Sequence, residues 1–390
     1  MIRMITAGES HGQYMSGIIE GLPAGVPVGI KFIEEELKRR RIGYGRSSRM
    51  ATEQDRLTIL AGVSRGKTTG APVAILIENS DWKIQREIEK NEGKPAPLPP
   101  VVIPRPGHAD LAGSVKYGLE DLRDVSERAS ARETVVRTAL GCFARLFLKE
   151  IGIETASHTI TIGSIRISRP YSVPFETVAA ITEYDPFRCV EPETAEKMKA
   201  EIDSAKAAGD TLGGAVELLI KGVPPGIGDC MIPERRLSTR LAAAIFSIPS
   251  VKGFEIGGGA ALASSKGSKV TDAYYEKKDA RFRGDVQRKT NFAGGIEGGI
   301  STGEIIRCTA HFKPIPTLAN PLNSVNLETG EDAKAPAPRA DACIVPAAGV
   351  IMESIAAVII ADALMERFGA DRLDSIKKNI KTNLYESSQK

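Results

Sequence analysis

The segment that most constrains the fold is 350–368, which reads Val-Ile-Met-Glu-Ser-Ile-Ala-Ala-Val-Ile-Ile-Ala-Asp-Ala-Leu-Met-Glu-Arg-Phe. It predicts a helix whose apolar residues surround the whole circumference instead of forming one stripe. A helix of this kind must be buried, either in a protein core or in a subunit interface. Because the chain contains no run of about 18 consecutive apolar residues, we expect no membrane span.

The rest of the chain is ordinary for a globular protein, with 42% hydrophobic and 26% charged residues among 390. Strands are predicted at 16–20, 28–32, 71–78, 159–167, 215–221 and 304–308, and helices at 34–41, 130–150, 193–208, 238–247 and 350–368. This mixed order favours one large α+β unit over residues 1–390. We expect a glycine-rich bend at 253–259, a mobile loop at 329–338 and a frayed C-terminal tail at 369–390, in which residues 371–390 form a polar helix that frays.

The five cysteines are scattered and show no C-x-x-C spacing: Cys142, Cys189, Cys230, Cys308 and Cys343. This pattern argues against a zinc site or a disulfide framework and predicts a reducing, cytoplasmic location. The first residues show no secretory signal pattern.

Five glycines occur in Asn291–Gly303, which precedes a predicted strand. Paired glycines allow positive φ and close approach of a ligand to the backbone. The stretch is therefore either a tight hairpin or a phosphate cradle, with Lys313–Thr317 downstream as a possible partner. Both interpretations stay open on the sequence alone.

The densest basic run is Lys38–Arg41 followed by Arg46 and Arg49, with no carboxylate between Glu36 and Glu53. Such a run is often a solvated surface. Here the arginines outnumber the local acids, and guanidinium groups suit phosphate and carboxylate, so we expect an anion site.

Two nucleotide-binding motifs are excluded. Gly62–Thr68 resembles a P-loop but has three residues between its glycines instead of four, and a strand follows where the motif needs a helix. No G-x-G-x-x-G follows a predicted strand, so a Rossmann domain has no support.

Two histidines are predicted to lie in loops. His11 stands among small residues in Gly8–Gly12, and His108 lies between an arginine and an aspartate in Arg105–Asp110. A loop histidine can transfer protons near neutral pH, although His108 could instead simply be held by Asp110 in a turn.

Ser130 and Glu133 have the spacing of a capping box at a helix N-terminus. Arg128 and Arg132 flank this serine at an end where the helix dipole disfavours cations, which suggests a bound anion. Taken together, these features predict acid–base chemistry on a polyanionic small molecule, with a phosphorylated cofactor.

Nine motifs, in the same order over nearly the whole chain, resemble the chorismate synthase family: Gly8–Gly12, Arg39–Arg46, Arg105–Asp110, Arg128–Thr134, Gly209–Gly214, Val251–Gly257, Asn291–Gly303, Lys313–Thr317 and Arg339–Asp341. The resemblance implies a β-α-β sandwich with internal pseudo-symmetry, assembled as a homotetramer. It also implies the 1,4-anti elimination of phosphate from 5-enolpyruvylshikimate-3-phosphate to give chorismate, with reduced FMN and no net redox change.

The resemblance assigns catalytic roles to His11, His108, Ser10, Ser130 and Asp341. His11 would protonate the departing phosphate and His108 would govern protonation of the reduced flavin. Substrate anions would be held by Arg40, Arg46, Arg49, Arg105 and Arg132, of which Arg40 and Arg46 are also linked with NADPH. FMN would contact Arg128, Ala129, Ser130, Pro249, Ser250, Gly298, Lys313, Pro314, Ile315, Pro316, Thr317 and Arg339.

Two positions depart from the family pattern. Val190 replaces a common proline, and Pro249-Ser250 replaces a flavin-contacting Asn-Ala pair. Since proline has no backbone donor, the second departure weakens the assignments of Pro249 and Ser250.

Two other functions are compatible with parts of the pattern. An NADPH-dependent flavin reductase would consume NADPH without a shikimate-type substrate. An RNA-binding protein would use the patch at residues 39–49 and would bind more weakly as salt rises. Aromatic residues are only 5% of the chain, so stacking platforms for bases are scarce.

Overall fold

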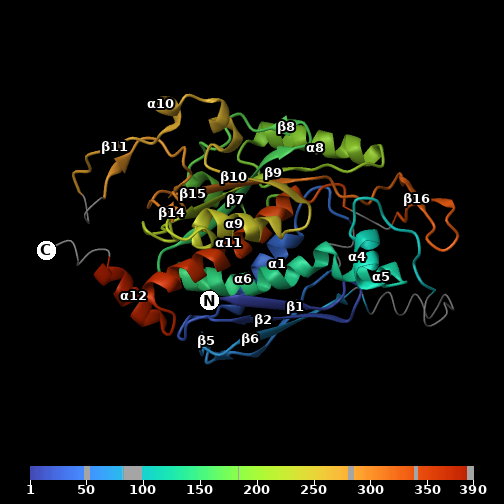
Figure 1. Ribbon diagram of the computed structural model, residues 1–390, viewed down its shortest axis with the longest axis horizontal. Helices are drawn as coiled ribbons and strands as arrows, with labels where there is room; N and C mark the ends of the chain where they lie inside the picture. Colours follow the sequence, from blue (N-terminus) through green and yellow to red (C-terminus); the bar gives the residue numbers. More distant parts are fainter. Residues whose placement is uncertain are drawn as a thin grey trace.

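The computed structural model describes residues 1–47, 53–80, 82, 99–182, 184–279, 285–337 and 341–383. Two antiparallel sheets enclose a layer of helices, with the larger sheet above and the smaller one below in Figure 1. The resulting β-α-β sandwich confirms the expected fold class.

The smaller sheet has the strand order β1-β2-β6-β3, with β1 at Arg3–Ala7, β2 at Tyr14–Glu20, β6 at Val73–Glu78 and β3 at Leu57–Ala61. Alternate residues of β6, namely Val73, Ile75 and Ile77, are buried against the helices. This period of two is what a half-buried strand requires. At Gly17 on β2, an added Cβ would lie 2.4 Å from Val136, so glycine lets the helix pack directly on the strand.

The larger sheet has the order β10-β15-β9-β7-β8. Its strands are β10 (Val251–Ile256), β15 (Ile306–Phe312), β9 (Gly214–Lys221), β7 (Glu154–Ile162) and β8 (Ile165–Arg166). The central strand β9 is buried from Ala215 to Ile220, because both of its faces are covered. Phe175 and Val178 of the short helix α7 (Phe175–Ala179) pack on its outer face.

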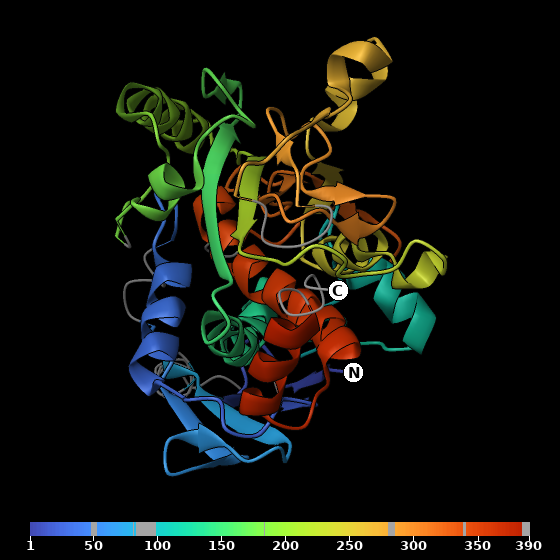
Figure 2. The same cartoon turned by 90° about the vertical axis from the view of Figure 1, so that its left-hand side faces the viewer.

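The helical layer consists of α1 (Ile30–Arg41), α6 (Thr134–Lys149), α9 (Leu237–Phe246) and α11 (Val345–Phe368). Figure 2 shows α11 running through the interior beside α6. An added Cβ on Gly141 would lie 2.5 Å from the carbonyl oxygen of Ser354, so these two helices cross at close range. α11 is long and apolar enough to cross a membrane by length and composition, but its burial in this layer accounts for that composition.

A group of buried charges lies inside the helical layer. Glu353 of α11 is fully buried and accepts hydrogen bonds from Arg39, from Arg188 and from the hydroxyl of Ser157. Its carboxylate also pairs with Arg145 at 3.2 Å. Burial raises the pKa of Glu353, but the surrounding arginines outweigh it and lower the pKa to about 2.

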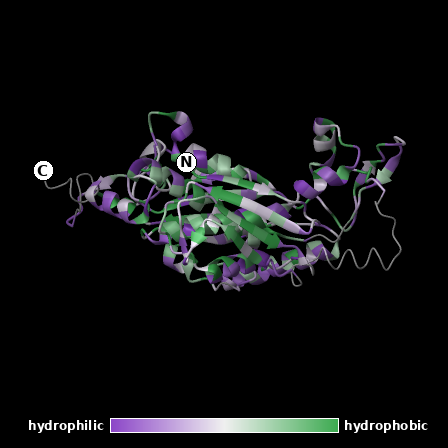
Figure 3. Ribbon diagram, turned by 90° about the horizontal axis from the view of Figure 1, so that it is seen from below, coloured by the Kyte–Doolittle hydropathy of each residue, from purple (hydrophilic) through white to green (hydrophobic). Residues whose placement is uncertain are grey.

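Smaller elements surround the sandwich, and Figure 3 shows hydrophobic residues concentrated at its centre while the periphery is mostly hydrophilic. The peripheral helices are α4 (Asp110–Tyr117), α5 (Leu122–Arg128), α8 (Pro192–Ala207), α10 (Gly267–Val270) and α12 (Leu373–Lys381), with short 3-10 turns at Ala131–Glu133, Pro233–Arg235 and Gly259–Ser264. The two-stranded pairs are β4 (Val63–Ser64) with β5 (Lys67–Thr68), β11 (Tyr274–Tyr275) with β12 (Gln287–Arg288), β13 (Ile296–Glu297) with β14 (Ile300–Ser301), and β16 (Asn323–Val325) with β17 (Asp332–Lys334).

Several sequence expectations need correction. Residues 28–32 do not form a strand, because α1 already begins at Ile30. The bend expected at 253–259 is mostly strand β10, whose partner β15 supplies the ladder hydrogen bonds. The loop expected at 329–338 contains β17, and residues 338–340 lie outside the described residues.

Two further differences concern helix ends. The tail, expected to be a polar helix that frays, does carry a helix, α12, and this helix packs Leu373 and Ile376 into the core. Residues 384–390 lie outside the described part of the chain. Ser130 caps a 3-10 turn by accepting from the backbone of Arg132, while Glu133 accepts from Thr6, so the reciprocal capping box is not formed.

Candidate active site

A cavity of about 640 Å³ opens between the helical layer and the ends of β10 and β15. Its walls come from segments that are far apart in the sequence: 10–11, 40–47 together with Glu53, 105–109, 126–134, 246–252 and 312–317, closed by 341–351 at the start of α11. The volume lies within the range of roughly 300–1,000 Å³ that is typical of ligand sites.

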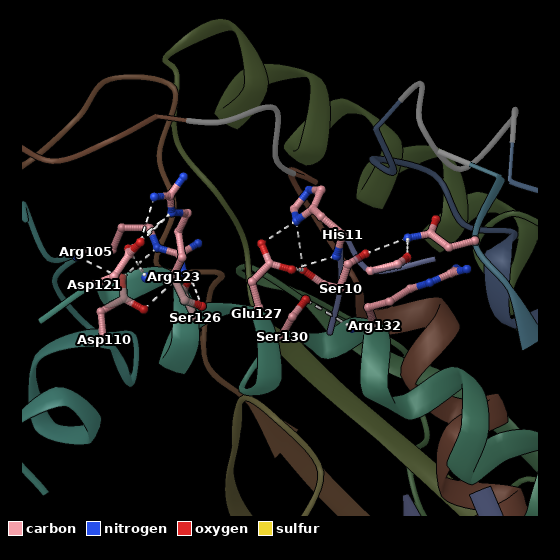
Figure 4. A network of polar contacts seen from close by, with 12 residues as sticks. Ser10, His11, Arg105, Asp110, Asp121, Arg123, Ser126, Glu127, Ser130 and Arg132 are labelled. Carbon is pink, nitrogen blue, oxygen red and sulfur yellow. Dashed lines mark hydrogen bonds and ion pairs between the residues drawn. The ribbon is translucent and has the colours of Figure 1, made fainter. Parts of the chain in front are cut away.

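His11 is held at one side of the cavity by Glu127 of α5 (Figure 4). Its Nδ1 lies 2.7 Å from Glu127 Oε1, and its backbone N–H donates to Oε2 at 2.6 Å. The hydroxyl of Ser10 donates to the same Oε2 at 2.9 Å. Burial opposes ionisation of Glu127, but the hydrogen bonds from His11 and Ser10 keep its pKa below the ordinary value.

His108 has a similar arrangement with Asp110, the first residue of α4. His108 Nδ1 lies 2.5 Å from Asp110 Oδ1, and Arg105 donates to Asp110 through Nε at 2.8 Å. Although burial raises it, these hydrogen bonds hold the pKa of Asp110 well below its usual range. The cavity therefore contains two histidines whose Nδ1 atoms each face an ionised carboxylate.

Arg40 supplies a buried positive charge to the cavity. Consecutive residues of a helix point about 100° apart. Arg39 therefore donates to Glu353, whereas Arg40 donates to the hydroxyl of Thr134 and to the carbonyl of Ala131. Burial lowers the pKa of Arg40 to about 10. It makes no ion pair with any residue that the structure describes, and its Nη1 has no hydrogen-bond partner among them.

Arg132, which was expected to hold a substrate anion, is already paired with acids. It contacts the buried carboxylates of Glu53 and Asp55, the second at 2.6 Å. Its Nε and Nη2 are buried without a hydrogen-bond partner in the described part of the chain. Arg132 is thus partly neutralised and keeps only part of its capacity for an anion.

Another part of the wall is built from the turn before β10 and from the segment after β15. Ser250 adopts a φ of +72°, and its carbonyl accepts from the backbone N–H of Lys313 at 2.9 Å. Lys313 Nζ donates to the carbonyl of Gly107 at 2.8 Å, which ties this wall to the loop that carries His108. Thr211 fixes the next residues by donating to the carbonyl of Ile315.

These residues fit a flavin mononucleotide. Flat apolar surface is offered by Pro249, Ile315 and Pro316. Among the residues that the structure describes, Lys313 and Arg40 donate only to neutral oxygens, so both can meet a phosphate. The unsatisfied guanidinium nitrogens of Arg40 and Arg132 indicate that an anionic ligand completes the site. Among the residues that the structure describes, no group of three or more His, Cys, Asp or Glu could hold a metal ion.

Most of the residues expected to form the site line this one cavity: Ser10, His11, Arg40, Arg46, Arg105, His108, Ala129, Ser130, Arg132, Pro249, Ser250, Lys313, Ile315, Pro316, Thr317 and Asp341. Two predicted residues, Arg49 and Arg339, lie outside the described residues.

Three predicted flavin contacts do not line the cavity. Arg128 points to Thr6, donating to both its carbonyl and its hydroxyl oxygen. Gly298 lies in the turn between β13 and β14, so the hairpin interpretation of this stretch is confirmed. Pro314 lies between two lining residues but is not itself part of the wall.

Sequence reasoning missed Glu127 and the acids Glu53 and Asp55. The one available signal was that Glu127 directly precedes Arg128, the first residue of a recognised motif. Nothing in the sequence links it to His11, which lies 116 positions away.

Comparisons with known proteins agree on one family. The family model described as "Chorismate synthase" matches residues 2–365. The protein named "Chorismate synthase" from Arthrobacter sp. (strain FB24) is 46% identical over 393 residues, covering 98% of this chain and 96% of that protein. Its counterpart from Carboxydothermus hydrogenoformans is 44% identical and covers 98% of both chains. A solved structure, "Crystal Structure of Chorismate Synthase", matches with a TM-score of 0.78 at 33% identity, covering 100% of this chain and 99% of that one.

Proposed function

The chain belongs to the chorismate synthase family, and we propose that it converts 5-enolpyruvylshikimate-3-phosphate to chorismate and inorganic phosphate in the shikimate pathway. The reaction is an elimination, so the enzyme is a lyase. The bond between C3 and the phosphate oxygen breaks, a hydrogen leaves C6, and a second ring double bond forms.

The observation that carries the proposal is the composition of the cavity. Two histidines, each bonded at Nδ1 to a carboxylate, share it with a buried arginine that has no acidic partner in the described structure. A phosphorylated dicarboxylate needs cations for binding and a proton donor for its leaving group. The cavity supplies both.

Each residue would have a distinct task. His11 would give a proton from Nε2 to the departing phosphate, which is a far better leaving group when it carries less charge. Arg40 and the unsatisfied nitrogens of Arg132 would hold the anionic groups of the substrate. Ser130 and Asp341, which both line the cavity, would assist proton transfer.

Reduced FMN, when bound, would supply electron density as phosphate leaves. The wall formed by Pro249, Ser250 and Lys313–Thr317 would orient its ring, and His108 would set the protonation state of the ring from the loop that Lys313 anchors. We further propose NADPH as an indirect reductant near Arg40 and Arg46, a homotetrameric assembly and a cytoplasmic location.

The test is an anaerobic assay with reduced FMN and 5-enolpyruvylshikimate-3-phosphate, in which chorismate absorbance and phosphate release are followed together. We expect both products in equal amounts, with no net oxidation of the flavin. Release of neither product by well-folded protein would contradict the proposal. NADPH consumption in the absence of the substrate would instead support the flavin reductase, which the comparisons do not favour.

A further inference from the structure

We infer that Glu127 is a positioning residue for the reaction, because its carboxylate fixes the His11 ring so that Nε2 is the nitrogen that exchanges a proton with the substrate. This inference rests on the proposed function and extends it to a residue outside the recognised catalytic set.

The contacts between Glu127 and the His11 loop are extensive. Oε1 faces His11 Nδ1 at 2.7 Å, while Oε2 accepts from the His11 backbone at 2.6 Å and from the Ser10 hydroxyl at 2.9 Å. The backbone carbonyl of Glu127 accepts from the N–H of Ser10 at 3.2 Å. Backbone and side chain of one helical residue thus hold two consecutive residues of the loop.

The orientation of the ring depends on this support. The His11 side chain is 52% exposed, so packing alone does not determine its rotamer. Asn79 holds the backbone of the loop by donating to the carbonyls of Ser10 and Gly12. Glu127 contacts the ring itself, through its carboxylate oxygen Oε1 at Nδ1 (Figure 4).

The charge of Glu127 determines the tautomer. Its pKa lies below the ordinary value, so the group is a carboxylate at neutral pH and can only accept hydrogen bonds. Nδ1 must therefore carry a proton, and the Ser10 oxygen, 3.0 Å from Nδ1, can share it while donating to Oε2. In the imidazolium form, the proton on Nε2 is the one available for transfer.

The proton balance of the step follows directly. A proton passes from Nε2 of the imidazolium to an oxygen of the leaving phosphate, and the electron pair of the N–H bond stays on the ring. The ring becomes neutral while Nδ1–H remains bonded to the unchanged carboxylate. No rotation of the ring is needed, which is the benefit of a preorganised proton donor.

The first experiment is a double-mutant cycle in the anaerobic assay. Glu127→Gln keeps the size of the side chain but removes its charge, and we expect kcat to fall about 10- to 100-fold with unchanged KM and unchanged affinity for reduced FMN. Glu127→Asp retains a carboxylate and should recover part of the loss. In a His11→Ala background, Glu127→Gln should cause no further decrease, because its effect passes through His11.

The matched control is Asp124→Asn, which removes one negative charge from an exposed position on the same helix. We expect wild-type kcat in this variant. If Glu127→Gln lowers kcat by the same factor with and without His11, or weakens FMN binding along with kcat, then Glu127 acts elsewhere and the inference is overturned.

A second experiment does not depend on activity. The chain has four histidines, so ring-labelled histidine gives few NMR signals, and His11→Ala identifies the one of interest. We expect neutral His11 to carry its proton on Nδ1 in the wild type, with a smaller share of this tautomer in Glu127→Ala and Glu127→Gln. A wild-type ring protonated on Nε2 would overturn the inference even if chorismate forms. The expected tautomer without chorismate formation would instead refute the proposed function and leave the positioning intact.

Discussion

Asp341, just before α11, forms an ion pair with Arg46, just after α1. Its Oδ2 lies 3.1 Å from the Arg46 guanidinium, and its Oδ1 accepts from the backbone N–H of Ser47 at 2.6 Å. Both side chains are mostly buried in the cavity wall. The loop after α1 and the segment before α11 are thus held together at the site.

This pairing predicts energetic coupling between the two side chains. Arg46→Met and Asp341→Asn should each destabilise the protein, and the double variant should lose less than the sum, with a coupling energy of about 0.5–3 kcal/mol. Urea unfolding of all four proteins measures it. Strictly additive losses would mean that the contact contributes nothing to stability.

Arg40 should matter for activity more than for stability. Arg40→Met removes a buried cation that has no acidic partner in the described structure, so unfolding stability should stay the same or rise. The value of kcat/KM should fall about 100-fold or more, because the anionic substrate loses a fixed charge in a desolvated site. Lys31→Met, at an exposed position of the same helix, is the control and should leave both quantities unchanged. Equal activity of the two variants would exclude Arg40 from the anion site.

The buried carboxylate of Glu353 should make the stability of the protein depend on pH in the acidic range. Its pKa is about 2 in the folded protein against an ordinary 4.5, so the unfolded chain binds the proton more readily. The stabilisation is complete above about pH 4.5 and is lost as pH falls towards 2.

The isosteric variant Glu353→Gln tests this. At pH 7 it should be less stable by about 3–5 kcal/mol, since three buried arginines lose their shared anion. The difference from wild type should shrink steadily below pH 4.5. The measurement is the denaturant midpoint of both proteins across this pH range. A difference between them that stays constant with pH would mean that Glu353 is not the responsible group.

Gly257, at the end of β10, should be sensitive to substitution for steric reasons. Gly257 has a φ of +59°, and an added Cβ would lie 2.0 Å from the carbonyl oxygen of Phe292. Gly257→Ala should therefore destabilise the protein by about 1–3 kcal/mol or more. At Gly267 an added Cβ meets nothing within 4 Å, so Gly267→Ala should be neutral or slightly stabilising. Thermal unfolding of both variants tests this. Equal unfolding temperatures would mean that close packing is not the reason for a glycine at position 257.

The sequence was informative wherever a local pattern had one physical solution. An apolar circumference over 350–368 could only be buried, and α11 is indeed the central helix of the layer. Helix 34–41 and strand 215–221 were located within a few residues, because periodicity and glycine turns mark their ends. The short helices α4 and α5 were missed, since neither has a long amphipathic repeat.

The candidate residues were also visible in the sequence, because histidines and arginines among small residues in loops are chemically conspicuous. The sequence predicted which residues line the cavity better than it predicted which of them are already paired with other residues. Arg132 was counted as available for the substrate, yet Glu53 and Asp55 are paired with it in the fold.

What the sequence by itself determined was the main long elements, such as the buried helix at 350–368, and the chemical groups available to the site. Partners, tautomers and charge states were decided only by the tertiary structure. Glu127 reaches His11 across 116 positions and Asp341 reaches Ser47 across 294. The physical reason is that hydrogen bonds and ion pairs act over a few ångströms in space, whereas local sequence patterns report only on neighbours along the chain. The packing of two sheets on α1, α6 and α11 brings those distant groups within that range.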